Sequence, residues 1–294
     1  MTQEKQVVVI DLEDEEEDES SPKRRKIESN ALEKLMMRDN RHELNFDELV
    51  RIIQSFPTSG YKGRAECFKL KDGAIFAYVP DFFPRSLAAS LYGAVDECVK
   101  GTTTGWEQRS VNIFGKPRPQ HRLVHWFSNT PYTYSGQSIG ADPAPDLLKE
   151  MSSMFTGVVN ELLDLQLKGT LDGILCNRYK DGHDEVKEHS DYETDLDNAW
   201  PIVSLSLGAA RLFTLRPSNK QPIPDDALCL LKTSKSFKIS QNAANRIDLT
   251  LTPGSMFIMG GTAQKTWKHA VPTQSQVKEA RINLTFRKIR NRPR

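Results

Sequence analysis

Hydrophobic residues follow two different periods along the chain. Over residues 31–38, 46–56, 84–99 and 145–165 they recur every three or four positions, which is the period of a helix with one buried face. Most other apolar positions fall in short runs that predict strands, at 67–70, 74–79, 173–179, 202–207, 211–215, 228–231, 247–251, 255–259 and 280–288. Helices first and many short strands afterwards predict an α+β fold with a double-stranded β-helix (jelly-roll) core and flanking helices.

The same pattern divides the chain into three parts. Residues 1–30 contain no aromatic residue and combine an acidic with a basic block, so they cannot bury enough apolar surface to offset the entropy of ordering. We therefore expect a disordered N-terminal tail over 1–30, a helical extension over 31–65 and one folded domain over 66–294.

Composition and charge narrow the class of protein. Hydrophobic residues make up 38% of the chain and charged residues 27%, which fits a soluble globular protein and excludes collagen-like and disulfide-scaffold classes. We expect no membrane span and no secretory signal, hence a cytosolic or nuclear chain whose four scattered cysteines are reduced thiols. The tail holds ten acidic and five basic residues, a net −5, and the remaining 35 basic and 29 acidic residues leave +6, which is compatible with a polyanionic partner.

Two short motifs lie in the tail. The β-branched run that starts at Val7 and ends at Leu12 is followed by seven acidic residues and resembles a SUMO-interacting motif, which would add as a strand to the partner's sheet edge. The alternative is an apolar patch with solvating acids. The basic cluster from Lys23 to Lys26 is of nuclear-localisation type, and it predicts an import receptor as a partner and a nuclear location, the alternative being a solvated charge run.

A candidate metal site lies in the strand-rich half. His189 and Asp191 are two positions apart, so in an extended segment their side chains point the same way. His269 supplies a second imidazole after the predicted strand 255–259. Two histidines and one carboxylate form the facial triad of non-haem Fe(II) oxygenases, although a single H-x-D pair is more often two polar surface residues. His183 is the nearest alternative ligand.

A candidate anion site lies on the last predicted strand. Alternation places Arg281, Asn283, Thr285 and Arg287 on one face and the apolar residues between them on the other. Two buried guanidiniums need anions, and a small dicarboxylate would satisfy both. The side chains of Asn177 and Tyr179 share the same alternation upstream and would add neutral donors.

In this order, Asn177-x-Tyr179, His189-x-Asp191, His269 and Arg281-x-Asn283-x-x-x-Arg287 resemble the AlkB family of 2-oxoglutarate- and Fe(II)-dependent nucleic-acid dealkylases, over roughly residues 76–288. The resemblance implies that His189, Asp191 and His269 are catalytic and hold the iron. It implies that the other five residues hold 2-oxoglutarate, with Arg281 paired to its distal carboxylate, and that dioxygen is the oxidant. An inactive AlkB-like protein is disfavoured because no ligand position is substituted.

The segment upstream is similar to the nucleotide-recognition lid of nuclear AlkB homologs that repair DNA. By that similarity Tyr134 and His189 would sandwich an extruded base, Glu193 would lie near the base, and Phe114 would fill the stack left behind. Tyr132 and Trp126 are further candidate substrate contacts in the same segment. For the three sheet aromatics, Trp126, Tyr132 and Tyr134, the alternative is ordinary sheet packing, and for Phe114 it is a plain surface aromatic.

Two features depart from the family pattern. Tyr192 stands where the duplex-repairing relative has an acid, so the preferred base can differ, and residues 217–246 make an unusually long connection, either a functional loop or an insertion. The resemblance thus implies that 66–294 is a dioxygenase domain that removes N-alkyl groups from bases such as 1-methyladenine and 3-methylcytosine in nuclear DNA. The alternatives are an RNA demethylase with the same mechanism and a SUMO-reading protein that uses the fold as a scaffold.

Overall fold

The computed structural model describes residues 44–290, apart from 114, 115, 135, 136, 219, 220, 242 and 244. The expected disordered tail, its SUMO-type motif from Val7 to Leu12, its basic cluster and the predicted helix 31–38 lie outside the described residues. Phe114 also lies outside them.

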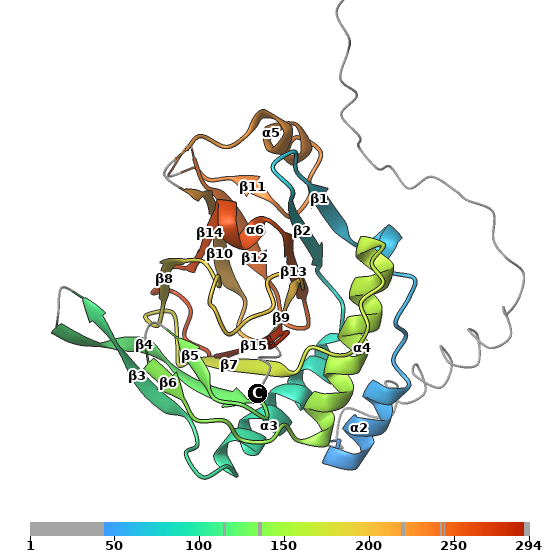
Figure 1. The fold of residues 1–294 in the computed structure, drawn as a ribbon, viewed down its shortest axis with the longest axis vertical. Coiled ribbons are helices and arrows are strands. Elements are labelled where there is room, and N and C mark those ends of the chain that lie inside the picture. The colour runs from blue at the N-terminus through green and yellow to red at the C-terminus, as the bar shows by residue number, and fades with distance from the viewer. Residues whose placement is uncertain are drawn as a thin grey trace, which may run out of the picture.

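Two antiparallel sheets face each other and form the predicted jelly-roll (Figure 1). The larger has the strand order β1-β2-β13-β9-β15-β7-β4-β3 and the smaller β11-β12-β10-β14-β8. The strand bounds are β1 Glu66–Lys69, β2 Ala74–Val79, β3 Glu107–Ile113, β4 Lys116–Phe127, β7 Gly173–Tyr179, β8 Val186–His189, β9 Ile202–Gly208, β10 Arg211–Pro217, β11 Lys238–Ile239, β12 Ile247–Leu251, β13 Met256–Gly261, β14 Trp267–Val271 and β15 Arg281–Arg287. A separate small hairpin joins β5 Tyr132–Tyr134 to β6 Gln137–Ile139.

Two helices, α3 Arg85–Lys100 and α4 Asp146–Leu163, cover the outer face of the larger sheet, and α2 Phe46–Gln54 packs against α4 (Figure 1). Helix α2 begins with a capping box, in which Asn45 accepts from the Glu48 N–H and Glu48 accepts from the Asn45 N–H. Its residues Leu49, Ile52 and Ile53 are buried in the same apolar cluster as the faces of α3 and α4. A second apolar cluster fills the space between the two sheets.

The hydrophobic pattern predicted the core elements well and failed at residues 228–231. The predicted helices 46–56, 84–99 and 145–165 are confirmed, and so are the strands at β1, β2, β7, β9, β10, β12, β13 and β15. Residues 228–231 are not a strand, because they form the last turn of helix α5 Asp225–Leu231. Pro224 before this helix and two aspartates in its first turn are helix-start signals that outweigh a four-residue apolar run.

The long connection 217–246 is an ordered part of the fold where it is described. It holds α5 and the short strand β11, which pairs with β12. The Glu66 carboxylate on β1 accepts hydrogen bonds from Ser234, Lys235 and Ser236 and so fastens the connection to the larger sheet.

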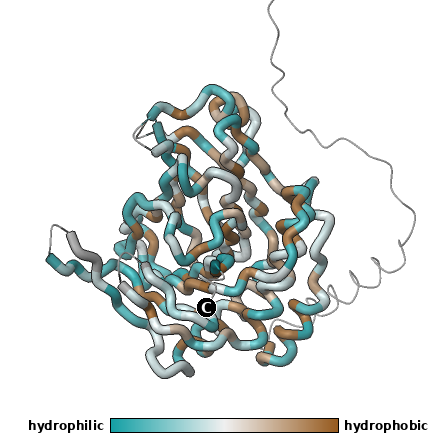
Figure 2. The backbone as a smooth tube through the Cα atoms, in the orientation of Figure 1, coloured by the Kyte–Doolittle hydropathy of each residue, from teal (hydrophilic) through white to brown (hydrophobic). Residues whose placement is uncertain are grey.

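The sequence analysis did not predict strands β3 and β4, because much of this hairpin is polar and lacks a strong alternation of apolar residues. The hairpin of β3 and β4 projects from the body in Figure 1, and Figure 2 shows it to be largely hydrophilic toward its outer end. Residues 116–119 at the start of β4 are exposed, whereas the second half of β4 is mostly buried. None of the described helices has both the length and the apolar composition needed to cross a membrane.

Candidate metal and anion site

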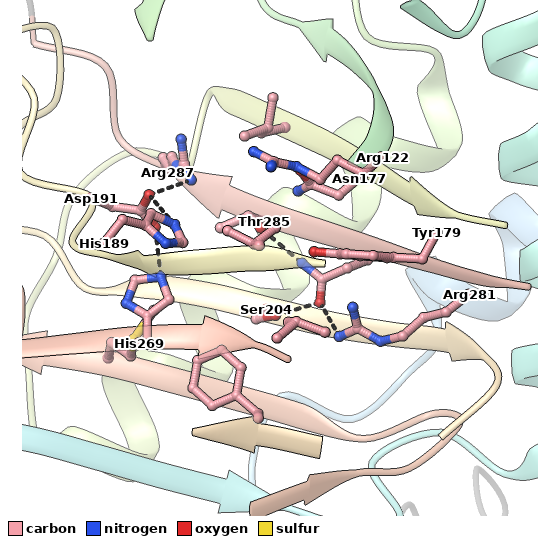
Figure 3. A pocket seen from close by; sticks show the side chains of 16 residues that line it. Arg122, Asn177, Tyr179, His189, Asp191, Ser204, His269, Arg281, Thr285 and Arg287 are labelled. Atoms are coloured by element: carbon pink, nitrogen blue, oxygen red, sulfur yellow. Dashed lines mark hydrogen bonds and ion pairs between the residues drawn. The ribbon is translucent and has the colours of Figure 1, made fainter. Parts of the chain in front are cut away.

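The three predicted metal ligands come together at one end of a pocket between the two sheets (Figure 3). His189 ends β8 and lies opposite His269 on β14, and Asp191 follows two residues after His189. Their ligand atoms all lie within 4.8 Å of one another, and each histidine Nε2 is 3.7 Å from a carboxylate oxygen of Asp191. His183 is exposed and hydrogen-bonded to Asp181, so it is not part of this cluster.

Hydrogen bonds, burial and nearby charges favour the protonation states in which these three side chains can bind a metal. Assigned as the proton donor, Nδ1 of His189 is 2.9 Å from the Lys187 carbonyl oxygen, which leaves Nε2 to face a metal. Burial lowers the pKa of His269 to about 3 and also lowers the pKa of His189, so both imidazoles are neutral. Burial is the largest single influence on Asp191 and alone would raise its pKa, but the nearby charges, of which that of Arg287 is the strongest, together outweigh burial and lower the pKa. Two neutral imidazoles and one carboxylate suit Fe(II).

At the other end of the pocket Arg281 carries a buried charge with unused donors (Figure 3). The side chain is 1% exposed, and Nη2 donates to Asn283 Oδ1 at 2.7 Å and to Ser206 Oγ at 2.9 Å. Among the described residues, Nε and Nη1 have no hydrogen-bond acceptor. Burial lowers the pKa of this guanidinium to about 10. Such a group suits a carboxylate that accepts two charge-assisted hydrogen bonds.

The alternation predicted for β15 is confirmed. Arg281, Asn283, Thr285 and Arg287 line the pocket, while Ile282 and its two apolar counterparts on the strand pack into the cluster under the helices. The Asn283 side-chain oxygen accepts hydrogen bonds from Arg281 and Ser204, and its Nδ2 donates to Thr285. These contacts orient the Arg281 guanidinium.

The two arginines of β15 line the same pocket but have different partners within the protein. Arg287 lies at the metal end, where Nη2 is 3.0 Å from Asp191 Oδ1 and Nη1 donates to the Tyr132 hydroxyl at 2.7 Å. Its charge is therefore already balanced by a metal ligand. The Tyr179 ring lies at the anion end, with the Arg281 guanidinium 5.2 Å from its centroid.

Two pocket-side contacts were not predicted from the sequence. Arg122 on β4 donates from Nε to Asn177 Oδ1 at 2.7 Å, across the register that pairs β4 with β7. Gln264, on the short helix α6 Ala263–Thr266, accepts a hydrogen bond from the Asp191 N–H at 2.8 Å and fixes the metal-binding loop. No local pattern marks either contact, because each joins residues more than 50 positions apart.

Of the predicted base contacts, His189 lines the pocket, whereas Trp126, Tyr132 and Glu193 are not among its lining residues. Tyr132 is fully buried and donates from its hydroxyl to Glu193 Oε2 at 2.8 Å. Trp126, also fully buried, stacks on Tyr132 with ring centroids 4.5 Å apart. Both positions favour the packing alternative. Burial, assisted by the charge of Asp191, raises the pKa of Glu193. Tyr134 is the last residue of β5.

A jelly-roll with a histidine–aspartate–histidine cluster facing a buried arginine is the arrangement of 2-oxoglutarate-dependent iron oxygenases. Residues 76–287 match the model of the 2OG-Fe(II) oxygenase superfamily, and the chain belongs to this family, whose members use Fe(II), 2-oxoglutarate and dioxygen.

Relatives within the family confirm the resemblance to AlkB. The chain is 32% identical over 189 residues to alpha-ketoglutarate-dependent dioxygenase alkB homolog 3 of Mus musculus, with 64% of this chain and 59% of that protein covered. It is 32% identical over 181 residues to DNA oxidative demethylase ALKBH2 of Homo sapiens, covering 61% and 60%. A solved structure described as "The structure of OsALKBH1" aligns with a TM-score of 0.47 and 14% identity over 72% of this chain and 97% of that one. The chain thus spans about three fifths of the length of these two curated relatives.

Proposed function

We propose that this protein removes N-alkyl groups from bases in DNA by oxidation, the direct reversal of damage such as 1-methyladenine and 3-methylcytosine. The observation that carries the proposal is the pocket whose metal-type cluster and unpaired Arg281 donors lie at opposite ends. The relatives named as an alkB homolog and as DNA oxidative demethylases support nucleic acid as the substrate.

Each residue of the pocket then has a chemical task. His189, Asp191 and His269 would hold iron, and Arg281 would bind the distal carboxylate of 2-oxoglutarate. When bound, iron and 2-oxoglutarate would supply the oxidation: one oxygen atom of dioxygen would enter the cosubstrate, which would release carbon dioxide and become succinate, and the other would enter the C–H bond of the alkyl group. The hydroxymethyl group formed on the base then leaves as formaldehyde, and the nitrogen regains its unmodified state.

The exposure of the cluster residues supports access of a base to the metal cluster. The His189 side chain is 28% exposed, whereas that of Asp191 is 3% exposed, so one imidazole forms the open wall of the cluster. Arg287 pairs with Asp191 and Tyr132 and fixes the carboxylate, while Tyr132 holds Glu193 close to the same wall. An extruded base stacked on His189 would place its alkyl group next to the metal ligands.

The proposal is tested by product analysis. Methylated single-stranded DNA, the same lesion in a duplex, and methylated RNA are incubated in parallel with Fe(II), ascorbate and 2-oxoglutarate, and the nucleosides are analysed by mass spectrometry. We expect unmodified base and formaldehyde from DNA, none with Asp191→Ala, and full activity with the exposed control His183→Ala. Turnover of RNA alone would establish the RNA demethylase alternative, and consumption of 2-oxoglutarate without change to any nucleoside would refute nucleic acid as the substrate.

The N-terminal tail extends the proposal to partners and location. A nuclear location, import through the cluster from Lys23 to Lys26, and SUMO binding through the run from Val7 to Leu12 are supported by the sequence pattern of residues 1–30. SUMO binding is tested by titrating SUMO with a peptide that covers residues 1–22. We expect shifts of the SUMO signals that become smaller as salt is added, and no shift at millimolar peptide would refute SUMO binding. In this proposal residues 66–294 form the dioxygenase domain, and residues 31–65 form a helical extension of that domain.

A further inference from the structure

A second pocket adjoins the first on the side away from Arg281. Met259 and Arg287 line both pockets. The second pocket is also lined by two aromatic side chains and two lysines that the proposed chemistry does not use: Tyr192, Trp200, Lys265 and Lys288. Each lysine Nζ lies over one of the rings, 5.6 Å from the centroid of Tyr192 for Lys265 and 5.5 Å from the centroid of Trp200 for Lys288.

The Tyr192 ring is unusually exposed for so large a side chain. It is 51% exposed, more than either of the two other large exposed hydrophobic residues in the described part of the chain, Phe46 and Ile239. It directly follows the metal-cluster residue Asp191, and Lys265 directly follows Gln264, which accepts the Asp191 N–H. The ring and the lysine are therefore carried by the same two segments that fix the metal cluster, in the pocket next to it.

The positive charge of Lys265 is available to a ligand. Lys288 is bound by Asp172 at 2.6 Å, and Arg287 by Asp191 at 3.0 Å. Within the described residues, Lys265 has no carboxylate at ion-pair distance and its side chain is exposed. Its contact with the Tyr192 ring is a surface cation–π contact, which is weaker than the stacking of a nucleobase on an aromatic ring, so the lysine can leave the ring for a phosphate.

We propose that Tyr192 and Lys265 form a platform for the nucleotide next to the lesion, with Tyr192 stacking its base and Lys265 binding its phosphate. This inference rests on the proposed function and concerns the binding of its single-stranded DNA substrates. In a duplex the flanking base is already stacked and paired, so the platform gains nothing there. In a single strand the flanking base is free, and an aromatic ring next to the metal cluster holds it without regard to its sequence.

The platform is tested by comparing a substrate that has a flanking nucleotide with one that has none. Turnover of a methylated free nucleoside is compared with turnover of the same lesion within a single-stranded oligonucleotide, for the wild type, Tyr192→Ala, Tyr192→Phe and Lys265→Ala. Phe46→Ala and Lys232→Ala remove an exposed ring and an exposed charge elsewhere and serve as matched controls. Loss of one stacked base predicts that Tyr192→Ala raises KM for the oligonucleotide roughly five- to hundredfold with kcat unchanged, and leaves the free nucleoside unaffected.

The remaining outcomes separate this inference from the proposed function. Tyr192→Phe is expected to retain the wild-type KM, and Lys265→Ala to raise KM for the oligonucleotide and reduce its dependence on salt. Equal losses on nucleoside and oligonucleotide, or none on either, would refute the platform. If the wild type dealkylates no substrate, the proposed function fails, but the platform can still be tested by measuring the binding of an unmodified single strand by fluorescence anisotropy. Weaker binding by Tyr192→Ala than by the wild type would support the platform, and unchanged binding would refute the platform.

Discussion

Removal of the Arg281 guanidinium is the most direct test of the anion end of the pocket. In the structure Nε and Nη1 of this residue have no acceptor among the described residues, and the side chain is 1% exposed. A carboxylate that meets both groups gains two charge-assisted hydrogen bonds, each worth about 1.5–3 kcal/mol. Arg281→Ala should therefore weaken 2-oxoglutarate binding by about 3 kcal/mol or more, which is roughly a hundredfold in affinity.

The fold should tolerate this substitution. The Asn283 oxygen keeps its hydrogen bond from Ser204 at 2.8 Å when the arginine is absent, and an unbalanced buried charge is removed. Arg281→Lys is the matched variant, because it retains a charge but cannot donate in a bidentate manner, and it should lose affinity to an intermediate degree. Thermal unfolding of all three proteins checks that the fold is retained.

Binding is measured directly, so that turnover does not enter the result. Calorimetric titration of 2-oxoglutarate into protein loaded with Mn(II), without dioxygen, gives the cosubstrate affinity, and a separate titration with Mn(II) gives the metal affinity. The reasoning requires the first affinity to fall and the second to remain. An unchanged affinity for 2-oxoglutarate in Arg281→Ala would remove this residue from the site, and a lost affinity for Mn(II) would show that the substitution disturbs the metal cluster.

Three further predictions concern the metal cluster and the lid. Asp191→Ala should abolish tight Mn(II) binding while His183→Ala leaves it intact, since His183 lies outside the cluster; the reverse result would reassign the ligands. Gln264→Ala should weaken Mn(II) binding by roughly 10- to 100-fold in the same titration, because the Asp191 loop loses its anchor, and an unchanged affinity would make that hydrogen bond incidental. Phe114→Ala should slow repair of a methylated duplex by roughly tenfold or more and spare the single strand, because only a duplex must be held open; equal loss on both substrates would assign Phe114 to the lid fold.

The local geometry of the site was determined by the sequence alone. The period of two along β15 put Arg281 and Arg287 on one face and Ile282 on the other, because successive side chains of any strand point to opposite sides. The spacing of His189 and Asp191 likewise brought two ligands to one side of an extended segment. These features depend on positions a few residues apart, which the backbone geometry fixes before any tertiary contact forms.

The tertiary structure decided which charges meet. That Arg287 is paired with Asp191 while Arg281 retains unused donors depends on where the loop after β8 lies relative to β15, nearly one hundred positions further along the chain. The hydrogen bond from the Asp191 N–H to Gln264 and the exposure of the Tyr192 ring have the same origin. Such contacts follow from the packing of the two sheets against each other, and periodicity carries no information about partners so distant in sequence.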